Sequence, residues 1–194
     1  MPVVVLHSRA MAAAEGKASG DRSARLKAAR DVFYSGEIAQ DIVANSEAVG
    51  GIVAVEDLTG YDAKFEKPIS TTFEGHEIFG QSTWTQAGVL MQTLNMLEGV
   101  DLARMGHNSP EYIHTVTETL KLAMADRQVF YGDPDFASVP IDGLLSKKYA
   151  AERADLIDAG RAYPEIPPAG DPWRHSSLKG DAPAQQAVPV ALTG

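Results

Sequence analysis

The sequence contains no cysteine, and this absence excludes several kinds of chemistry. Without a thiol the chain forms no disulfide, no thiolate nucleophile and no cysteine-rich zinc site. Long hydrophobic runs are also missing near the N-terminus, where the apolar stretch covers only Val3–Leu6 and no basic residue precedes it. That stretch is too short for the core of a secretory signal or for a membrane helix. We therefore expect no membrane contact. The compartment stays open, and the absence of a signal peptide from this sequence slightly favours the cytoplasm.

Basic residues are fewer than acidic residues. Lys and Arg together number 17 against 26 for Asp and Glu, which gives a formal net charge of −9. A net negative field repels nucleic-acid phosphates and anionic membrane surfaces, so neither is an expected partner. The acidic residues are spread along the chain, without the run of like charges that is typical of an interaction tail.

Complete catalytic motifs are absent as well. The sequence has no G-x-S-x-G nucleophile motif and no glycine-rich phosphate loop of the Walker type. His107, His114 and Glu118 are the strongest metal-ligand candidates, but their spacing does not match H-E-x-x-H or a comparable zinc pattern. We predict a structural or solvent-facing role for the histidines, with a histidine-based metal hydrolase as a distant alternative. No metal, no cofactor and no catalytic residue is assigned to this chain.

The residues that are present predict a helix-rich α+β fold with one β-hairpin. Residues 69–73 and 76–81 alternate as two strands, and Glu74–Gly75 supplies a tight turn in which glycine permits positive φ. Periodic apolar residues predict helices over 36–49, 85–97 and 146–157, and two short helical pieces before them that break near Ser19–Gly20.

A further helix is predicted from its N-terminal signals. Ser109 can cap the first free N–H groups, Pro110 has no N–H to leave unpaired, and Glu111 faces the positive end of the helix dipole. The apolar positions predict that one face packs on the core; they are Ile113, Val116, Leu120 and Met124.

The C-terminal part differs in composition from the rest. Six of the eleven prolines lie between Pro164 and Pro189, and large apolar residues are few. Such a segment buries too little surface to offset the entropy of ordering it, so we expect residues 159–194 to be loose or draped on a neighbour.

The most pocket-like sequence is "STWTQAG", which precedes the predicted helix over 85–97. Its candidate substrate-binding residues are Thr83, Trp84 and Gln86, because N–H groups at a helix N-terminus favour anions. A competing interpretation places Trp84 in the core and makes Thr85 the helix cap.

Four charged residues are predicted to be structural. Asp126 and Arg127 are interpreted as a partly buried ion pair that fixes a neighbouring loop. Asp133 and Asp135 flank Pro134 in "GDPDF", where aspartate usually closes an Asx-turn, so a turn is favoured over a catalytic carboxylate pair.

Seven blocks of the sequence, taken in order, are FYSGEIAQDIV, GGIVAVEDLTGYDA, PISTTFEGHEIFG, LMQTLNMLEGVDL, GHNSPEYIHTVTETLKLAMADR, GDPDF and VPIDGLLSKKYAAERADLID. Together they closely resemble the γ-glutamyltransferase family, in the second half of that family's large subunit. The similarity runs from about Phe33 to Asp158 and divides the chain into residues 1–32, which match weakly, residues 33–158 and a proline-rich tail over 159–194.

The resemblance implies a portion of an N-terminal-nucleophile (Ntn) hydrolase with a four-layer α/β/β/α sandwich. In such proteins a precursor cuts itself before a threonine, which then becomes the nucleophile of a small subunit. That implies a small-subunit partner for this chain and a cleavage junction at or near Gly194. Thr193 is not expected to be the nucleophile, because Gly194 alone follows it and it cannot present a free α-amine.

One segment departs from the family pattern. Typical members carry a Pro-rich Ser-Ser-Gly-Gly loop where this chain has Gln81–Gly88, "QSTWTQAG". The variant is similar to a branch of amidohydrolases and acylases, so the substrate is expected to be a small amide or a γ-glutamyl compound. Hydrolysis and acyl transfer stay open, as do one heterodimer and a dimer of heterodimers. The alternative from another class is a catalytically inactive fragment or binding module.

Overall fold

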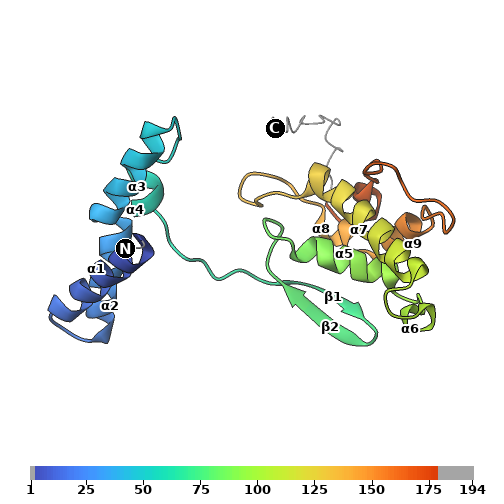
Figure 1. Ribbon diagram of the computed structural model, residues 1–194, viewed down its shortest axis with the longest axis horizontal. Coiled ribbons are helices and arrows are strands. Elements are labelled where there is room, and N and C mark those ends of the chain that lie inside the picture. The colour runs from blue at the N-terminus through green and yellow to red at the C-terminus, as the bar shows by residue number, and fades with distance from the viewer. Residues whose placement is uncertain (1–2, 179–194) are drawn as a thin grey trace. The chain divides into compact units, whose positions relative to one another are not determined.

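The computed structural model describes residues 3–178 and divides into two compact units between Phe65 and Glu66 (Figure 1). Both units are largely helical, and the second contains one antiparallel hairpin, which confirms the predicted α+β class. Within the described residues no helix combines the length and the apolar character needed to cross a membrane.

The first unit contains four helices: α1 (Val3–Lys17), α2 (Arg22–Tyr34), α3 (Glu37–Ala48) and α4 (Val55–Thr59). The predicted break near Ser19–Gly20 is confirmed, because Gly20 has φ 115° and the Asp21 side chain accepts the N–H of Ala24 at 2.8 Å. These two residues end α1 and begin α2, since glycine tolerates positive φ and aspartate is a favoured N-cap.

Helix α3 supplies the buried residues of this unit. Ile38, Ala39 and Val43 are buried on one face, as the predicted helix over 36–49 required. Outside the helices, Tyr61 stacks on Tyr34 with ring centroids 5.3 Å apart, and its carbonyl accepts a hydrogen bond from Arg30 at 2.6 Å. These contacts hold the chain after α4 against α2.

The hairpin consists of β1 (Ile69–Phe73) and β2 (His76–Gly80), paired from Ile69↔Gly80 to Phe73↔His76. Both turn residues have positive φ, 50° at Glu74 and 78° at Gly75, so the predicted tight turn is confirmed. The side chains of β1 that alternate toward α5 are half-buried, whereas the opposite face of the sheet is exposed.

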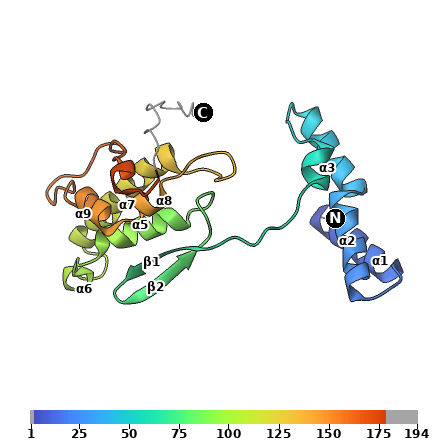
Figure 2. The same ribbon diagram turned by 180° about the vertical axis from the view of Figure 1, so that it is seen from behind.

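Helix α5 (Ala87–Leu97) is the centre of the second unit. It contacts the hairpin and packs against α7 (Pro110–Phe130) and α9 (Lys147–Ala154) (Figure 2). The short helices α6 (Leu102–Met105) and α8 (Ile141–Leu144) join these elements. The buried apolar core comprises Val89, Met91, Met96, Leu97, Leu122, Ala123, Ala125, Phe130, Val139, Leu144, Tyr149 and Ala150.

The N-terminus of α7 is as predicted, whereas its buried face is not. Ser109 accepts the N–H of Tyr112 at 3.1 Å and Pro110 occupies the first turn. The predicted apolar stripe is wrong, because Ile113 and Leu120 are exposed at 51% and 44%. The face that packs on α5 and α9 instead carries two carboxylates and a threonine among small apolar residues: Glu118, Thr119, Leu122, Ala123, Ala125, Asp126 and Phe130.

We call residues 159–178 the strap, since they run back from α9 over α7 and α8. We expected the tail to be loose or draped on a neighbour, and for this part the first alternative is wrong, because the strap lies on α7 and α8 of the same chain. Pro167 and Pro172 are buried, and a short 3-10 helix forms at Pro172–His175. The expectation from amino-acid composition took no account of hydrogen bonds from the strap backbone to charged side chains, which hold these residues in place, as described below. Residues 179–194, including the expected junction at Gly194, lie outside the described residues.

The boundary between the two compact units does not coincide with the divisions drawn from the resemblance. The structural boundary after Phe65 falls within the segment 33–158. The resemblance follows sequence blocks, whereas the units follow packing, so residues 33–65 belong to the first unit together with the weakly matched helices.

Candidate functional site

The segment before α5 uses Thr83 for structure. Its side chain is 4% exposed, and its hydroxyl donates to the carbonyl of Gly132 at 2.8 Å. This bond joins the loop before α5 to the loop after α7. Thr83 is therefore a loop contact, and its hydroxyl is directed at the protein.

Trp84 and Gln86 are exposed. The Trp84 side chain is 54% exposed and its indole Nε1 donates to Oε2 of Glu66 at 3.1 Å, so the alternative that placed Trp84 in the core is wrong. Gln86 is the N-cap residue of α5 but makes no side-chain capping bond. Thr85 contributes to the cap, since its hydroxyl accepts the N–H of Ala87 at 3.3 Å. The three candidates thus do not converge on a cavity, and their role in substrate binding stays a prediction.

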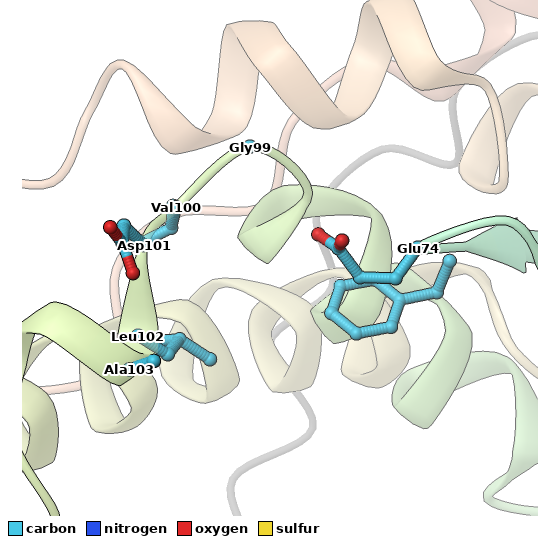
Figure 3. A pocket seen from close by; sticks show the side chains of 7 residues that line it. Glu74, Gly99, Val100, Asp101, Leu102 and Ala103 are labelled. Atoms are coloured by element: carbon cyan, nitrogen blue, oxygen red, sulfur yellow. The ribbon is translucent and has the colours of Figure 1, made fainter.

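The second unit has a hollow of about 480 Å³ at the hairpin turn, which Figure 3 shows from close by. Glu74 lies on one side of it and the residues from Gly99 to Ala103 lie on the other. Phe73 completes the lining. Its two carboxylates lie on opposite sides, and that of Asp101 is already used, because it accepts the N–H of Arg104 at 3.0 Å. No serine, threonine, histidine or cationic side chain lines the hollow, so it offers no hydroxyl or imidazole nucleophile.

A buried polar network of the second unit is centred on Asp126. Its carboxylate is fully buried and receives four donors, one each from α5, the strap and two positions of α9. They are Gln92 Nε2 at 3.0 Å, Tyr149 Oη at 2.8 Å, Arg153 Nη2 at 3.1 Å and the backbone N–H of Gly170 at 2.9 Å. Four donors satisfy the lone pairs of one carboxylate, which makes its burial tolerable.

The predicted partner of Asp126 was wrong. Its ion pair is with Arg153 on α9, and neighbouring residues of a helix, such as Asp126 and Arg127, point in different directions. The Nε of Arg127 is buried without a hydrogen-bond partner within the described part of the chain. The predicted function of the pair, fixing a neighbouring segment, does hold for Asp126, because that carboxylate binds the strap.

The network perturbs several ionisation equilibria. Burial raises the pKa of Asp126 above its ordinary value, although Arg153 and the hydrogen-bond donors oppose the shift. Burial and the nearby Asp126 charge likewise raise the pKa of Tyr131 and of Tyr149. Tyr131 Oη donates to Gln92 Oε1 at 2.9 Å, so both phenols act as neutral donors at neutral pH. The Asp126 carboxylate at the centre of the network is fully buried, and the network joins α5, α7, α9 and the strap.

Asp133 forms the predicted Asx-turn, since its Oδ1 accepts the N–H of Asp135 at 2.9 Å. The histidine-based metal site is not supported by the geometry. His114 Nε2 contacts the carbonyl of Asp158 at 2.9 Å, and Glu118 is taken by Lys121 and by the N–H of Tyr163. Across residues 3–178 no three His, Asp or Glu side chains are grouped to hold a metal ion.

Sequence patterns missed Gln92, Tyr149 and Arg153 as members of the network. One signal was available: "AGVLMQTLNML" carries Gln92 and Asn95 within an apolar helix, and a buried amide needs partners. The identity of those partners could not be found this way, because they lie far along the chain: Gln92 bonds to Asp126, 34 residues away, and Asn95 to Thr71, 24 residues away.

Comparison with known proteins agrees with the resemblance. The model of the gamma-glutamyltranspeptidase family matches residues 24–188. A glutathione hydrolase proenzyme of Escherichia coli strain K12 is 38% identical over 135 residues, 69% of this chain and 23% of that protein. The acylase ACY 1 proenzyme of Pseudomonas sp. strain SE83 is 37% identical over 133 residues, 68% of this chain and 24% of that protein.

Solved structures give the same result. The Helicobacter pylori gamma-glutamyltranspeptidase superposes with a TM-score of 0.64 at 35% identity, over 74% of this chain and 42% of that one. The cephalosporin acylase of Bacillus halodurans gives 0.58 at 26% identity, over 81% and 31%. The chain spans about a quarter of the length of the curated relatives described here. It belongs to the gamma-glutamyltranspeptidase family, whose Ntn-hydrolase fold it shares in part.

Proposed function

We propose that the chain is a large-subunit portion of a γ-glutamyltransferase-like Ntn amidohydrolase or acyltransferase. The observation that carries the proposal is the family match over residues 24–188, in a chain that covers 23% and 24% of the two curated relatives. A second segment, in the rest of the precursor, would supply the nucleophile.

The proposed chemistry takes place on that second segment. A threonine hydroxyl, deprotonated by its own α-amine, attacks the carbonyl carbon of a small amide, and the amine leaves with the proton. Water or an acceptor amine then resolves the acyl-enzyme and regenerates the threonine. The printed names of the two curated relatives, a glutathione hydrolase and an acylase, support a small amide or γ-glutamyl compound as substrate.

The proposed partner is a small subunit cut from the same precursor. Both curated relatives are named as proenzymes, which supports processing into two chains that stay together. Exposed apolar side chains in the second unit support a docking partner too: Phe79 is 61% exposed, Trp84 54% and Leu90 55%. These observations do not distinguish a single heterodimer from a dimer of heterodimers, so the proposal keeps both.

The test is denaturing mass spectrometry, with N-terminal sequencing, on the purified protein that contains these 194 residues and the segment after them. A second chain that begins with threonine, and that disappears when this threonine is replaced by alanine, supports the proposal. Self-cleavage and amide turnover that survive the replacement contradict it.

The rival proposal is a catalytically inactive binding module. The same exposed side chains, Phe79, Trp84 and Leu90, favour it if the chain functions alone. It predicts that the isolated chain binds a hydrophobic dye and forms oligomers that depend on concentration. Suppression of both properties by the co-expressed downstream segment supports the enzyme portion instead.

A further inference from the structure

Three carboxylates hold the strap by its backbone, at positions seven residues apart. Glu118 Oε2 accepts the N–H of Tyr163 at 2.8 Å, and Asp126 Oδ1 accepts the N–H of Gly170 at 2.9 Å. Asp142 Oδ2, at the start of α8, accepts the N–H of Ser177 at 2.7 Å. A backbone N–H bound to a carboxylate is a charge-assisted hydrogen bond, stronger than one between neutral groups.

Two of these carboxylates are each paired with a basic side chain that donates a hydrogen bond to a carbonyl of the strap. Lys121 Nζ pairs with Glu118 at 2.7 Å and donates to the carbonyl of Tyr163, also at 2.7 Å. Arg153 pairs with Asp126 and donates to the carbonyl of Pro168 at 3.1 Å. Each ion pair thus offers an acceptor and a donor to the strap backbone, whatever side chains the strap carries.

The strap also packs closely against the helices, which agrees with a strap held by its backbone. A Cβ at Gly170 would overlap the ring of Tyr149, and a Cβ at Gly143 would overlap the carbonyl of Pro172. Ser176 and Ser177 add hydroxyl donors to Asp142. The strap is therefore held along its length, by α7 at its start, by α7 and α9 in its middle and by α8 at its end.

We propose that Glu118, Asp126 and Asp142 form a clamp of positioning residues, which fixes the strap and so gives the chain beyond Leu178 a fixed starting point. The effect on processing rests on the proposed function, in which a small subunit is cut from the same precursor. The clamp itself does not depend on that function.

The clamp is tested by amide hydrogen exchange on the 194-residue chain. Asp142 is exposed, so Asp142→Ala removes one of the three clamp carboxylates, with its hydrogen bonds to Ser176 and Ser177, without opening the core. We expect the protection of amides in residues 173–178 to fall about tenfold or more, with α5 and α7 unchanged. Ser177→Pro removes the donor N–H from the strap side and gives the same loss, whereas Ser177→Ala keeps that N–H and loses less.

Asp155→Ala is the matched control, because Asp155 is an exposed carboxylate at the end of α9 with no part in the clamp. Strap amides that exchange as fast as an unstructured chain in the wild type overturn the clamp. Protection that is the same in Asp142→Ala and in Asp155→Ala overturns it as well.

The positioning role is tested in the precursor that carries the downstream segment. We expect Asp142→Ala to slow self-cleavage severalfold, and Asp155→Ala to cleave at the wild-type rate. A loosened strap with a wild-type cleavage rate overturns the positioning role and leaves the proposed function standing. A wild-type precursor that never cleaves contradicts the proposed function, while hydrogen exchange still decides the clamp.

Discussion

Arg153 of α9 and Asp126 of α7 face each other in the core of the second unit, with 3.1 Å between Nη2 and Oδ1 and side chains that are 5% and 0% exposed. Arg153 Nη2 also reaches the carbonyls of Leu122 and Pro168, at 3.2 and 3.1 Å. The pair therefore connects two helices and the strap in a region that excludes water. In such surroundings the loss of one partner is far more costly than the loss of both.

Removing the charge of Asp126 should destabilise the protein strongly. Asp126→Asn leaves the Arg153 guanidinium buried without its counter-ion, so we expect the free energy of unfolding to fall by about 3–5 kcal/mol. Urea denaturation measures this change. Lys27→Met is the control, because it breaks the exposed Lys27–Asp31 pair and should cost less than about 1 kcal/mol. Equal losses of unfolding free energy in the two variants would contradict a stabilising role for the buried Asp126–Arg153 pair.

Gly88 should be intolerant of even a methyl group. A Cβ at this position overlaps the ring of Tyr131, whose hydroxyl holds Gln92 of the network. We expect Gly88→Ala to destabilise the protein by about 1–3 kcal/mol, because the Tyr131 ring must move. Gly132→Ala is the matched control, since the nearest atom to its Cβ is Ala137 Cβ at 3.5 Å. Thermal denaturation of both variants measures this change. An unchanged melting temperature in Gly88→Ala would contradict the close packing of Gly88 against the Tyr131 ring.

The contribution of Asp142 should depend on pH. Burial tends to raise its pKa, but hydrogen bonds from Ser176, Ser177 and the N–H of Gly143 outweigh it and lower the pKa to about 2. A carboxyl whose pKa is lower in the folded state stabilises the fold above its ordinary value near 3.8 and loses that contribution as the pH falls toward 2. Because Asp142 is exposed, screening limits the effect to about 1 kcal/mol.

The measurement is the difference in unfolding free energy between the wild type and Asp142→Asn. We expect this difference to be present at pH 6 and to shrink between pH 4 and pH 2. A difference that does not change with pH would show that the Asp142 charge has no part in holding Ser177.

The hairpin turn should accept a stabilising substitution. Glu74 has φ 50°, a conformation that is uncommon for glutamate, and Gly75 follows with φ 78°. Two consecutive positive φ values are characteristic of a type I′ turn, for which Asn-Gly is preferred. We expect Glu74→Asn to raise stability by roughly 0.5 kcal/mol and Gly75→Val to lower it by more. A stability lower in Glu74→Asn than in the wild type would argue against this turn geometry.

Local signals in the sequence determined several elements of this protein. Glu74–Gly75 between alternating residues specified the hairpin, and Ser109–Pro110 specified the start of α7, because turns and caps are bonded within a few residues of themselves. The ordered blocks from Phe33 to Asp158 specified the family, and the family model matches residues 24–188. The absence of cysteine excluded disulfides, thiolate nucleophiles and cysteine-rich zinc sites, and no complete catalytic motif was found in the sequence.

Only the tertiary structure decided which charges meet and which face of α7 is buried. Asp126 binds Arg153, 27 residues further along, and Gly170, 44 residues further, so no local pattern could name these partners. Separate donors allowed Glu118 and Asp126 to be buried while Ile113 and Leu120 stayed exposed, against the apolar periodicity of the helix. Burial of a polar side chain depends on donors that other elements bring to it, and their arrangement arises only when the chain has folded.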